Sequence, residues 1–354
     1  MTNGKGTMRA WRTHEYGQPL EALKLDTVDI PEPEAGEVRV KVQGIPLNLA
    51  DMERVTGGNM FIRPELPYSP GMEVMGVVDS CGEGAEKWQG ERVVAITKGA
   101  HGGYAEYCIC PTASLFIMPD TIPLPGAAAL YFPFHLAWLG LYERAKVQAG
   151  ETVLVNGAAG GVGAAAVQLA VAAGARVIAV AGSDEKLAYC KQLGAEITVN
   201  HNTEDFVAVV REATNHKGVD IIFDNIGEEV LEQCLASVAY DGRYVVMGFS
   251  SDKSVADEKF YVPRRLAMAN VSLCCIMLYY AEEPMLTAMK DGAGLNFVPT
   301  KIGRELHAKL VEMVEQGALV PVVGEVINFE DVPQGLDDLL HRKTLGRTIV
   351  KLFD

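Results

Sequence analysis

The stretch VLVNGAAGGVGAAAVQLA, from Val153 to Ala170, decides the fold. Strand-forming residues run directly into glycines and alanines, and a helix of small residues follows with no polar turn between them. Ala158, Gly160 and Gly163 occupy the A-x-G-x-x-G positions of a turn whose bare backbone lets a pyrophosphate approach a helix amino end. The stretch predicts a dinucleotide-binding turn, and close packing of the helix on the strand is the plainer alternative.

Strands and helices alternate around this turn from about Thr152 to Met277, at the spacing of β–α–β units. Uniformly apolar strands are typical of a parallel sheet buried on both faces. Gly174 and Gly194 stand where helices are expected to end. Six strands are predicted, in the runs TVLVN, RVIAVA, EITVN, VDIIFD, RYVVMG and VSLCCIM. This context makes the glycine-rich turn a strong sign of a Rossmann, doubly wound parallel sheet.

The rest of the chain is β-rich. The runs VRVKVQG, MEVMGVVDSCG, ERVVAI and YAEYCIC read as short strands, and after Tyr280 come a helical run, IGRELHAKLVEMVEQG, and a last strand, GRTIVKLF. These C-terminal elements are too few to form a core, so we expect them to fold back onto the N-terminal part. The predicted domains are 1–126 with 281–354, a catalytic and substrate domain, and 127–280, an inserted cofactor domain.

Composition limits the classes of partner. The chain has 354 residues, enough for two domains, and a net charge of -15, which disfavours nucleic acid and acidic membrane surfaces. Its 7 cysteines form no paired CxxC units and are typical of reduced core thiols. With no apolar leader and no apolar run of the roughly 18 residues that a span needs, the sequence predicts a cytoplasmic protein.

The second strand predicts which cofactor is bound. NAD-binding folds usually place a carboxylate at its end, where this chain has Ala181, and no acidic residue occurs from Thr152 to Ser183. Ser183 and Lys186 instead offer a hydroxyl and a positive charge to a 2′-phosphate. We therefore expect NADPH, although Lys186 taken alone is equally consistent with a solvated helix residue.

Further motifs extend the pattern along nearly the whole chain: LNLADMERVTGG, PYSPGMEVMGVV, GEGAEKWQGERV, GGYAEY, AGSDEKL, GVDIIFD, DGRYVVMG and HRKTLGRTIV. With QAGETVLVNGAAGGVGAAAVQLA, they resemble the medium-chain dehydrogenase/reductase superfamily, specifically its zinc-free quinone oxidoreductase (zeta-crystallin-like) branch. The resemblance implies an α/β protein with a GroES-like β-rich catalytic domain and an inserted Rossmann domain. It also implies a homodimer and hydride transfer from NADPH to a small carbonyl-conjugated acceptor.

The zinc ligands of related enzymes are missing. Zinc-dependent relatives have Cys where this chain has Asn48, and Gly-His-Glu where it has Gly71, Met72 and Glu73; their structural four-cysteine lobe is also absent. The resemblance therefore implies metal-free chemistry, without a Lewis acid to activate an alkoxide. Asp51 and Glu73 are then interpreted as structural hydrogen-bonding groups.

Matching motif positions assign more residues to the cofactor. Ser183, Lys186 and Arg342 match groups that bind the 2′-phosphate, and Gly248 and Phe249 match positions that line the nicotinamide. The complete expected cofactor set is Ala158, Gly160, Gly161, Val162, Gly163, Gly182, Ser183, Lys186, His201, Asn225, Gly248, Phe249 and Arg342.

His201 stands where many relatives have Tyr, and it can still bond a phosphate. An ordinary imidazole has a pKa near 6.5, so we hypothesise that NADPH affinity tightens below about pH 6.5. A dissociation constant that ignores pH in both the parent and His201→Phe would remove this hypothesis.

The acceptor pocket departs further from the relatives. Glu53 stands where bacterial quinone reductases have an aromatic residue, and Leu136 replaces a threonine near the cofactor. The natural acceptor is therefore not fixed as a quinone. Four residues are expected in the catalytic pocket, in this order of preference: Asn48, Asp51, Tyr68 and His135. For Tyr68 a place in the core, and for His135 a packed position beside aromatic residues, are the alternatives.

Three functions remain open from the sequence. The first is an NADPH-dependent, zinc-independent reductase of a quinone or an α,β-unsaturated carbonyl, in which the protein mainly positions the reactants and excludes water. The second is an enoyl-thioester reductase, for which Arg63, Arg264 and Arg265 hint at a basic rim. The third is an NADPH-binding protein with low turnover.

Overall fold

The predicted parallel sheet is confirmed in the computed structural model, which describes residues 6–58, 63–248 and 263–352. Its strands run in the order β10-β9-β8-β11-β12-β13, and every neighbouring pair is parallel. The chain winds outward in opposite directions from β8, so the order reverses between β8 and β11. The strands are β8 (Thr152–Asn156), β9 (Arg176–Ala181), β10 (Ile197–Asn200), β11 (Val219–Asp224), β12 (Val238–Val246) and β13 (Ser272–Cys275).

Alternate residues of these strands enter two different cores. Val153, Val155 and Phe223 pack on the side of α3 and α4, whereas Leu154 and Ile222 pack with α6 and α7. Burial on both faces explains why the strands are apolar throughout. The helices are α1 (Pro19–Ala22), α2 (Leu49–Thr56), α3 (Gly126–Trp138), α4 (Gly161–Ala172), α5 (Asp184–Gln192), α6 (Phe206–Ala213), α7 (Leu231–Ser237), α8 (Pro263–Ala269), α9 (Met285–Ala293), α10 (Thr300–Glu315) and α11 (Val332–Leu340).

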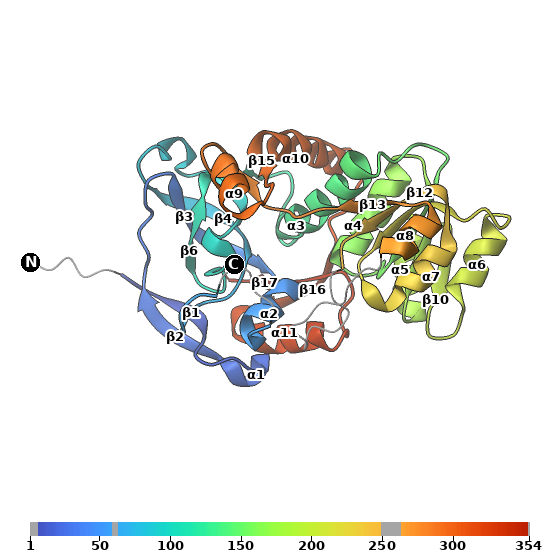
Figure 1. The fold of residues 1–354 in the computed structure, drawn as a ribbon. Helices are drawn as coiled ribbons and strands as arrows, with labels where there is room; N and C mark the ends of the chain where they lie inside the picture. Colours follow the sequence, from blue (N-terminus) through green and yellow to red (C-terminus); the bar gives the residue numbers. More distant parts are fainter. Residues whose placement is uncertain (1–5, 59–62, 249–262, 353–354) are drawn as a thin grey trace, which may run out of the picture.

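A seven-stranded sheet forms the β-rich half, drawn on the left of Figure 1. The order β16-β17-β3-β4-β5-β7 is antiparallel except for the β16–β17 pair, and β6 pairs with β3. The C-terminal strand β17 pairs with β3, so the expected return of the C-terminal segment is observed. The strands are β3 (Glu37–Pro46), β4 (Glu73–Cys81), β5 (Arg92–Ile96), β6 (Tyr107–Pro111), β7 (Leu115–Ile117), β16 (Val323–Asn328) and β17 (Arg347–Lys351).

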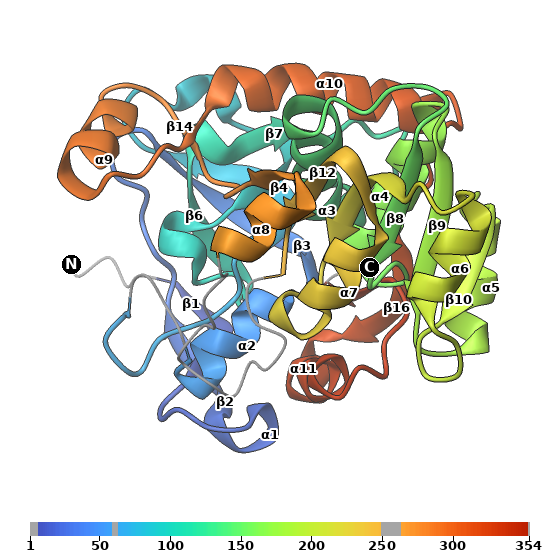
Figure 2. The same cartoon turned by 45° about the vertical axis from the view of Figure 1, so that its right-hand side comes forward.

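The helix α3 joins the two halves through one continuous core. It packs against α4 and against β3, β4 and β5, and α10 lies against it. Figure 2 shows α10 running along one edge of the molecule from the β-rich half towards the parallel sheet. Met75 and Phe116 of the antiparallel sheet therefore belong to the same buried cluster as Val155 and Phe223 of the parallel sheet.

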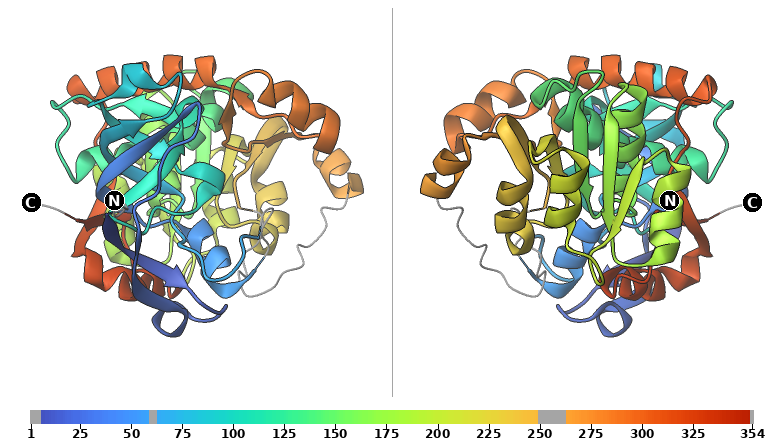
Figure 3. Two further views of the ribbon diagram at one scale, coloured as in Figure 1. Left: turned by 90° about the vertical axis from the view of Figure 1, so that its left-hand side faces the viewer. Right: turned by 90° about the vertical axis from the view of Figure 1, so that its right-hand side faces the viewer.

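Several smaller elements were not predicted. The hairpin β1 (Thr7–Thr13) with β2 (Leu23–Asp29) precedes the large sheet, and β14 (Tyr280–Ala281) pairs with β15 (Val298–Pro299) on either side of α9. The helices α8 and α9, in orange, lie together on one flank of the molecule, which is on the right in the left view of Figure 3 and on the left in the right view. Among the described residues, no helix is both long and apolar enough to cross a bilayer.

Candidate cofactor and acceptor site

The glycine-rich turn follows β8 at the point where the strand order reverses. Gly157 has a left-handed backbone, with φ of +63°. A Cβ on Gly163 would lie 2.2 Å from the Gly157 oxygen, so helix and turn approach too closely for any side chain. Gly160 precedes α4 with no side-chain cap, which leaves the first N–H groups of this helix for a ligand. The turn fits a pyrophosphate.

Residues that follow β11 and β12 lie beside this turn. The Asn225 side-chain amide donates to the Asn156 carbonyl oxygen at 2.8 Å, and a Cβ on Gly248 would lie 2.6 Å from the carbonyl carbon of Asn225. The structure thus brings Asn225 and Gly248 to the edge of the parallel sheet where Gly157 lies. Phe249, also expected at the cofactor, lies outside the described residues.

Asp224 orders the same edge and was not singled out from the sequence. Its carboxylate accepts hydrogen bonds from the backbone N–H groups of Ile226 and Gly227, at 3.0 and 3.1 Å, and from the Tyr244 hydroxyl at 2.6 Å. Burial raises the pKa of Asp224. An acidic residue at the end of an apolar strand, as in VDIIFD, was the available signal.

The expected 2′-phosphate residues gather at the end of β9. Ser183 caps α5, its Oγ accepting from the Lys186 backbone N–H at 3.3 Å. Lys186 Nζ donates to the Arg342 carbonyl oxygen at 2.8 Å, which brings the C-terminal segment to this place. The His201 Nε2 lies 2.9 Å from where a Cβ on Gly182 would be. Residues 182–186, His201 and Arg342, which come from three separate segments of the chain, are therefore neighbours.

Asp184 places a carboxylate directly after Ser183 in the sequence. Its Oδ1 accepts a hydrogen bond from the Asn200 side-chain amide at 3.1 Å, which turns the carboxylate towards β10. Asp184 and Glu185 lie in the first turn of α5, where negative charge stabilises the helix dipole. The stretch without acidic residues, Thr152 to Ser183, ends one residue before Asp184.

Asp51 on α2 is completely buried. Its carboxylate accepts from the Tyr104 hydroxyl at 2.9 Å and from the Met72 backbone N–H at 3.1 Å. Burial raises the pKa of Asp51 to about 6. These contacts fix α2 against the start of β4.

Tyr68 is buried beside the same helix. Its hydroxyl donates to the Arg54 carbonyl oxygen, and burial raises its pKa to about 12. The ring contacts His101 edge-on, with centroids 6.0 Å apart. Because its hydroxyl proton already has an acceptor, the core alternative describes Tyr68 better than a proton-donor role does.

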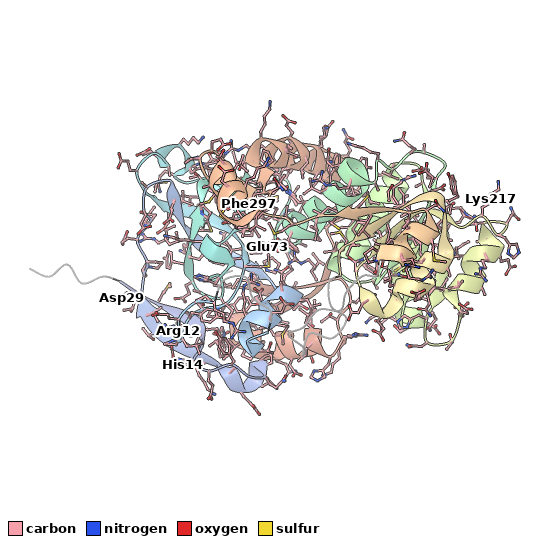
Figure 4. All side chains as sticks on the ribbon, in the orientation of Figure 1. Arg12, His14, Asp29, Glu73, Lys217 and Phe297 are labelled. Carbon is pink, nitrogen blue, oxygen red and sulfur yellow. The ribbon has the colours of Figure 1, made fainter. Side chains whose placement is uncertain are left out.

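Asn48 and Glu73 meet a residue that was not predicted, Arg347. One guanidinium nitrogen, Nη2, donates to Asn48 Oδ1 at 2.8 Å and to Glu73 Oε2 at 2.7 Å. All three residues are buried, and Figure 4 shows Glu73 in the middle of the molecule, between its two halves. An arginine at the start of the terminal strand, in GRTIV, was the available signal.

Arg347 also touches the cofactor turn. The preceding residue, Gly346, donates its N–H to the Ala159 oxygen at 2.9 Å, and a Cβ on Gly161 would lie 2.9 Å from Arg347 Cγ. The start of β17 therefore connects the glycine-rich turn with Asn48 and Glu73.

His135 lies elsewhere, in a chain of neutral groups. Its Nε2 is 2.9 Å from His307 Nδ1, its Nδ1 is 2.9 Å from the Tyr280 hydroxyl, and His307 Nε2 is 3.0 Å from the Ile117 oxygen. Since the carbonyl can only accept, His307 carries its proton on Nε2, and His135 must then donate from Nε2 and accept from Tyr280. Burial lowers the pKa of both histidines. We therefore leave His135 out of the proposed catalytic set.

No group of three or more His, Cys, Asp or Glu side chains in the described parts of the chain is placed to hold a metal ion. Two of the three arginines expected at a basic rim, Arg63 and Arg265, are engaged within the chain. Arg63 donates to the carbonyl oxygens of Gly57 and Gly58, and Arg265 pairs with Glu232.

Comparison with known proteins gives two family matches. The alcohol dehydrogenase GroES-like domain matches residues 34–120, and the domain described as zinc-binding dehydrogenase matches residues 161–324. The chain is 30% identical to the quinone oxidoreductase of Sus scrofa over 99% of this chain and 100% of that protein.

Solved structures give the same picture. A mycobacterial protein in complex with NADPH aligns with a TM-score of 0.81 at 28% identity, covering 97% of this chain and 99% of the other. The JamJ enoyl reductase in its apo form aligns with a TM-score of 0.81 at 27% identity, covering 98% and 100%. The chain belongs to the quinone oxidoreductase family of medium-chain dehydrogenases/reductases, and it is an oxidoreductase with a GroES-like part and a nicotinamide-cofactor-binding part.

Proposed function

We propose that this oxidoreductase uses NADPH, without a metal ion, to reduce a quinone or an α,β-unsaturated carbonyl compound. The contact of β17 with both sites carries the proposal, because Gly346 bonds the cofactor turn while Arg347 bonds Asn48 and Glu73. A cofactor on the turn and an acceptor beside Asn48 would meet at one place.

NADPH, when bound, supplies the hydride. The chain binds and orients it: Gly160, Gly161, Val162 and Gly163 offer backbone to the pyrophosphate, and Asn225 and Gly248 form the neighbouring edge. Preference for NADPH over NADH rests on Ser183, Lys186, His201 and Arg342. Two basic residues and a hydroxyl in one cluster suit a phosphate, since charge-assisted hydrogen bonds are each worth about 1.5–3 kcal/mol.

Metal independence is supported by the donor set beside the acceptor. Amide and thioether groups stand at the two relevant zinc-ligand positions, Asn48 and Met72, whereas zinc prefers Cys, His and carboxylate. The third group, Glu73, already bonds Arg347 at 2.7 Å. Metal analysis of the purified, active protein should therefore find less than about one tenth of an equivalent of zinc per chain.

We also propose that the chain forms a homodimer, as its family resemblance implies. The strand β13 ends the sheet order among the described residues, and Leu273 and Cys275 on it are exposed. An open strand edge with apolar side chains favours pairing with another chain. Light scattering coupled to size exclusion should give twice the mass of one chain, and a monomer mass would contradict the proposal.

The second candidate, an enoyl-thioester reductase, is favoured by the likeness to the JamJ enoyl reductase. The engagement of Arg63 and Arg265 within the chain weakens the basic rim that a coenzyme A or phosphopantetheine group would contact.

One experiment separates these functions. Oxidation of NADPH is followed by its near-ultraviolet absorbance with a quinone, a simple enone and an enoyl-CoA, and NADH serves as the cofactor control. Turnover with the quinone or enone is expected. Preference for the enoyl-CoA would favour the second candidate, NADPH binding without oxidation would indicate a low-turnover binding protein, and faster reaction with NADH would contradict the roles of Ser183 and Lys186.

A further inference from the structure

Asn48 has no amide hydrogen left for a ligand. Its Nδ2 lies 3.1 Å from the Pro46 carbonyl oxygen and 3.2 Å from Glu73 Oε2, and a primary amide has two hydrogens to donate. Its Oδ1 accepts from Arg347 Nη2 at 2.8 Å. The residue preferred from the sequence for contact with the acceptor is thus held at both ends of its amide.

Glu73 is equally engaged. Oε1 accepts from the Phe132 backbone N–H at 3.0 Å, and Oε2 accepts from Arg347 at 2.7 Å as well as from Asn48. The carboxylate is therefore a fixed counter-ion of the guanidinium. It holds the planar group of Arg347 in one orientation.

Arg347 keeps one buried donor for which the described residues offer no partner, the nitrogen Nη1. Buried guanidinium N–H groups are normally satisfied, so such an atom points to a ligand. The Tyr131 hydroxyl is also without a partner in the described parts, but its ring packs against Phe116 and His135, in the aromatic cluster around Tyr280. Arg347 is the member of the Asn48–Glu73 cluster that can bind a new oxygen atom.

We propose that Nη1 of Arg347 donates a hydrogen bond to the carbonyl oxygen of the acceptor, and that Asn48 and Glu73 are its positioning residues. This inference rests on the proposed reductase function. Hydride transfer from bound NADPH would break the C–H bond of the dihydronicotinamide, leave NADP⁺ and form a C–H bond on the acceptor carbon. The electron pair of the acceptor's conjugated π bonds would then move onto this oxygen. The guanidinium stabilises that charge and stays protonated, and water supplies the proton that completes the reduction.

The arrangement also explains how the site works without the zinc ligands. Asn48 and Met72 stand where zinc-dependent relatives have ligands, and the positive charge beside Glu73 comes from Arg347 instead. A fixed cation aimed at the developing charge can replace a Lewis acid in polarising a carbonyl.

The test is Arg347→Lys in the full-length protein. An ammonium group can keep the ion pair with Glu73 but lacks the second arm that carries Nη1. We expect kcat for the enone to fall about 100-fold while the dissociation constant of NADPH changes less than about threefold. The matched control is Arg39→Met, which removes an arginine paired with Asp79 in the β-rich half and should keep the parent kcat.

Two results would overturn the proposal. Parent-like kcat/KM with NADPH binding weakened more than about tenfold would assign Nη1 to a phosphate of the cofactor. Parent-like values of both would make Arg347 a purely structural residue. If Arg347→Lys does not fold, the double variant Arg347→Met with Glu73→Gln removes both buried charges together and is subject to the same criteria.

A second readout separates this inference from the proposed function. Infrared difference spectra of carbonyl-labelled cyclohexanone bound with NADP⁺ require no turnover. Arg347 should lower the carbonyl stretching frequency in the parent protein, and Arg347→Lys should lose part of that shift. A parent protein that reduces no acceptor but shows the shift would contradict the reductase function alone, whereas turnover without any shift, or a ketone that does not bind, would contradict the role of Arg347.

Discussion

Asp51 is a carboxyl group whose ionisation opposes folding. Its pKa is raised by burial to about 6, above the value near 3.9 of an unfolded chain. The folded protein therefore binds this proton more tightly than the unfolded chain does. The buried carboxylate lowers stability above about pH 6, and acidification towards about pH 4 relieves that cost.

The first prediction follows from this sign. As the pH falls from about 7 to about 4.5, the unfolding free energy of the parent should rise relative to Asp51→Asn by on the order of 2 kcal/mol. Urea unfolding followed by tryptophan fluorescence measures the difference. Asp79→Asn, which removes one of the ion-pair partners of Arg39, is the control. A parent-to-variant difference that stays constant with pH would disprove the assignment.

Two glycines of the cofactor turn make the second prediction. A Cβ on Gly160 would meet nothing closer than the Gly157 oxygen at 3.5 Å, an ordinary contact, whereas on Gly163 it would lie 2.2 Å from that oxygen. Gly160→Ala should keep the melting temperature within about 2 °C and weaken NADPH binding about tenfold, by blocking close approach to the backbone.

Gly163→Ala should lose stability as well, by about 1–3 kcal/mol, because the backbone must move. Thermal melts and NADPH titrations of both variants check this contrast. Equal melting temperatures for the two would mean that helix and turn can separate freely.

At the scale of elements, the two buried histidines bind three segments together. His135 belongs to α3, His307 to α10 and Tyr280 to β14, and burial lowers the pKa of His307 to about 4. Facing groups are Tyr131 on α3 and Phe116 on β7, and neither carries a charge. The pKa of His307 in the folded protein lies below the unfolded value near 6.5. The contribution of the neutral histidine pair to folding stability is therefore present above about pH 6.5 and is lost as the pH falls towards about 4.

The third prediction compares the parent with the triple variant His135→Phe, His307→Leu and Tyr280→Phe, which removes the polar chain. Between about pH 7 and about pH 5 the parent should lose on the order of 2 kcal/mol more stability than this variant. Urea midpoints measure it, with the exposed His216→Asn as control. A parallel fall in parent and triple variant would show that the buried pair does not titrate. The sign is opposite to that of Asp51, so the two effects are separable.

Elements with a clear pattern of apolar residues along the sequence were predictable, and elements without one were not. The six strands of the parallel sheet were predicted from their apolar runs. Gly174 and Gly194, which were expected to end helices, have left-handed backbones. The helix α3 is apolar on nearly all sides, so it shows no helical stripe, and Pro133 interrupts its run of alanine and leucine residues. Likewise α9 follows Pro284, in a stretch for which no helix was predicted.

For the candidate site, local motifs indicated the residues that we propose for the cofactor but not the partners of the residues that we propose for the acceptor. The glycine-rich turn, Ser183 and Lys186 lie within one β–α–β unit, where sequence spacing fixes their positions. Arg347 reaches Asn48 across 299 residues, and a contact of that range depends on tertiary packing. His307 was missed for the same reason, since 172 residues separate it from His135.

For the whole molecule, β17 connects the halves that hydride transfer must bring together. Gly346 donates its N–H to the Ala159 oxygen of the glycine-rich turn at 2.9 Å, and two residues further along the chain the Thr348 oxygen accepts from the Leu47 N–H at 3.0 Å. We propose two domains, one formed by residues 1–126 together with 281–354 and the other by residues 127–280. A short hydrogen-bonded path from the glycine-rich turn to Asn48 therefore crosses the boundary between them.

This path makes the last prediction. A ligand that binds the folded state stabilises it, by about 2.7 kcal/mol at a concentration 100 times its dissociation constant, and order in the turn should extend along β17. Saturating NADPH should slow amide hydrogen exchange in residues 346–351 and 47–51 as well as in the turn, measured by mass spectrometry. The helix α6, which packs at the far edge of the parallel sheet beside β10, is the internal control and should change little. Protection confined to residues 152–201 would show that the cofactor orders its own half alone, and β17 would then be a structural strand without a part in joining cofactor and acceptor.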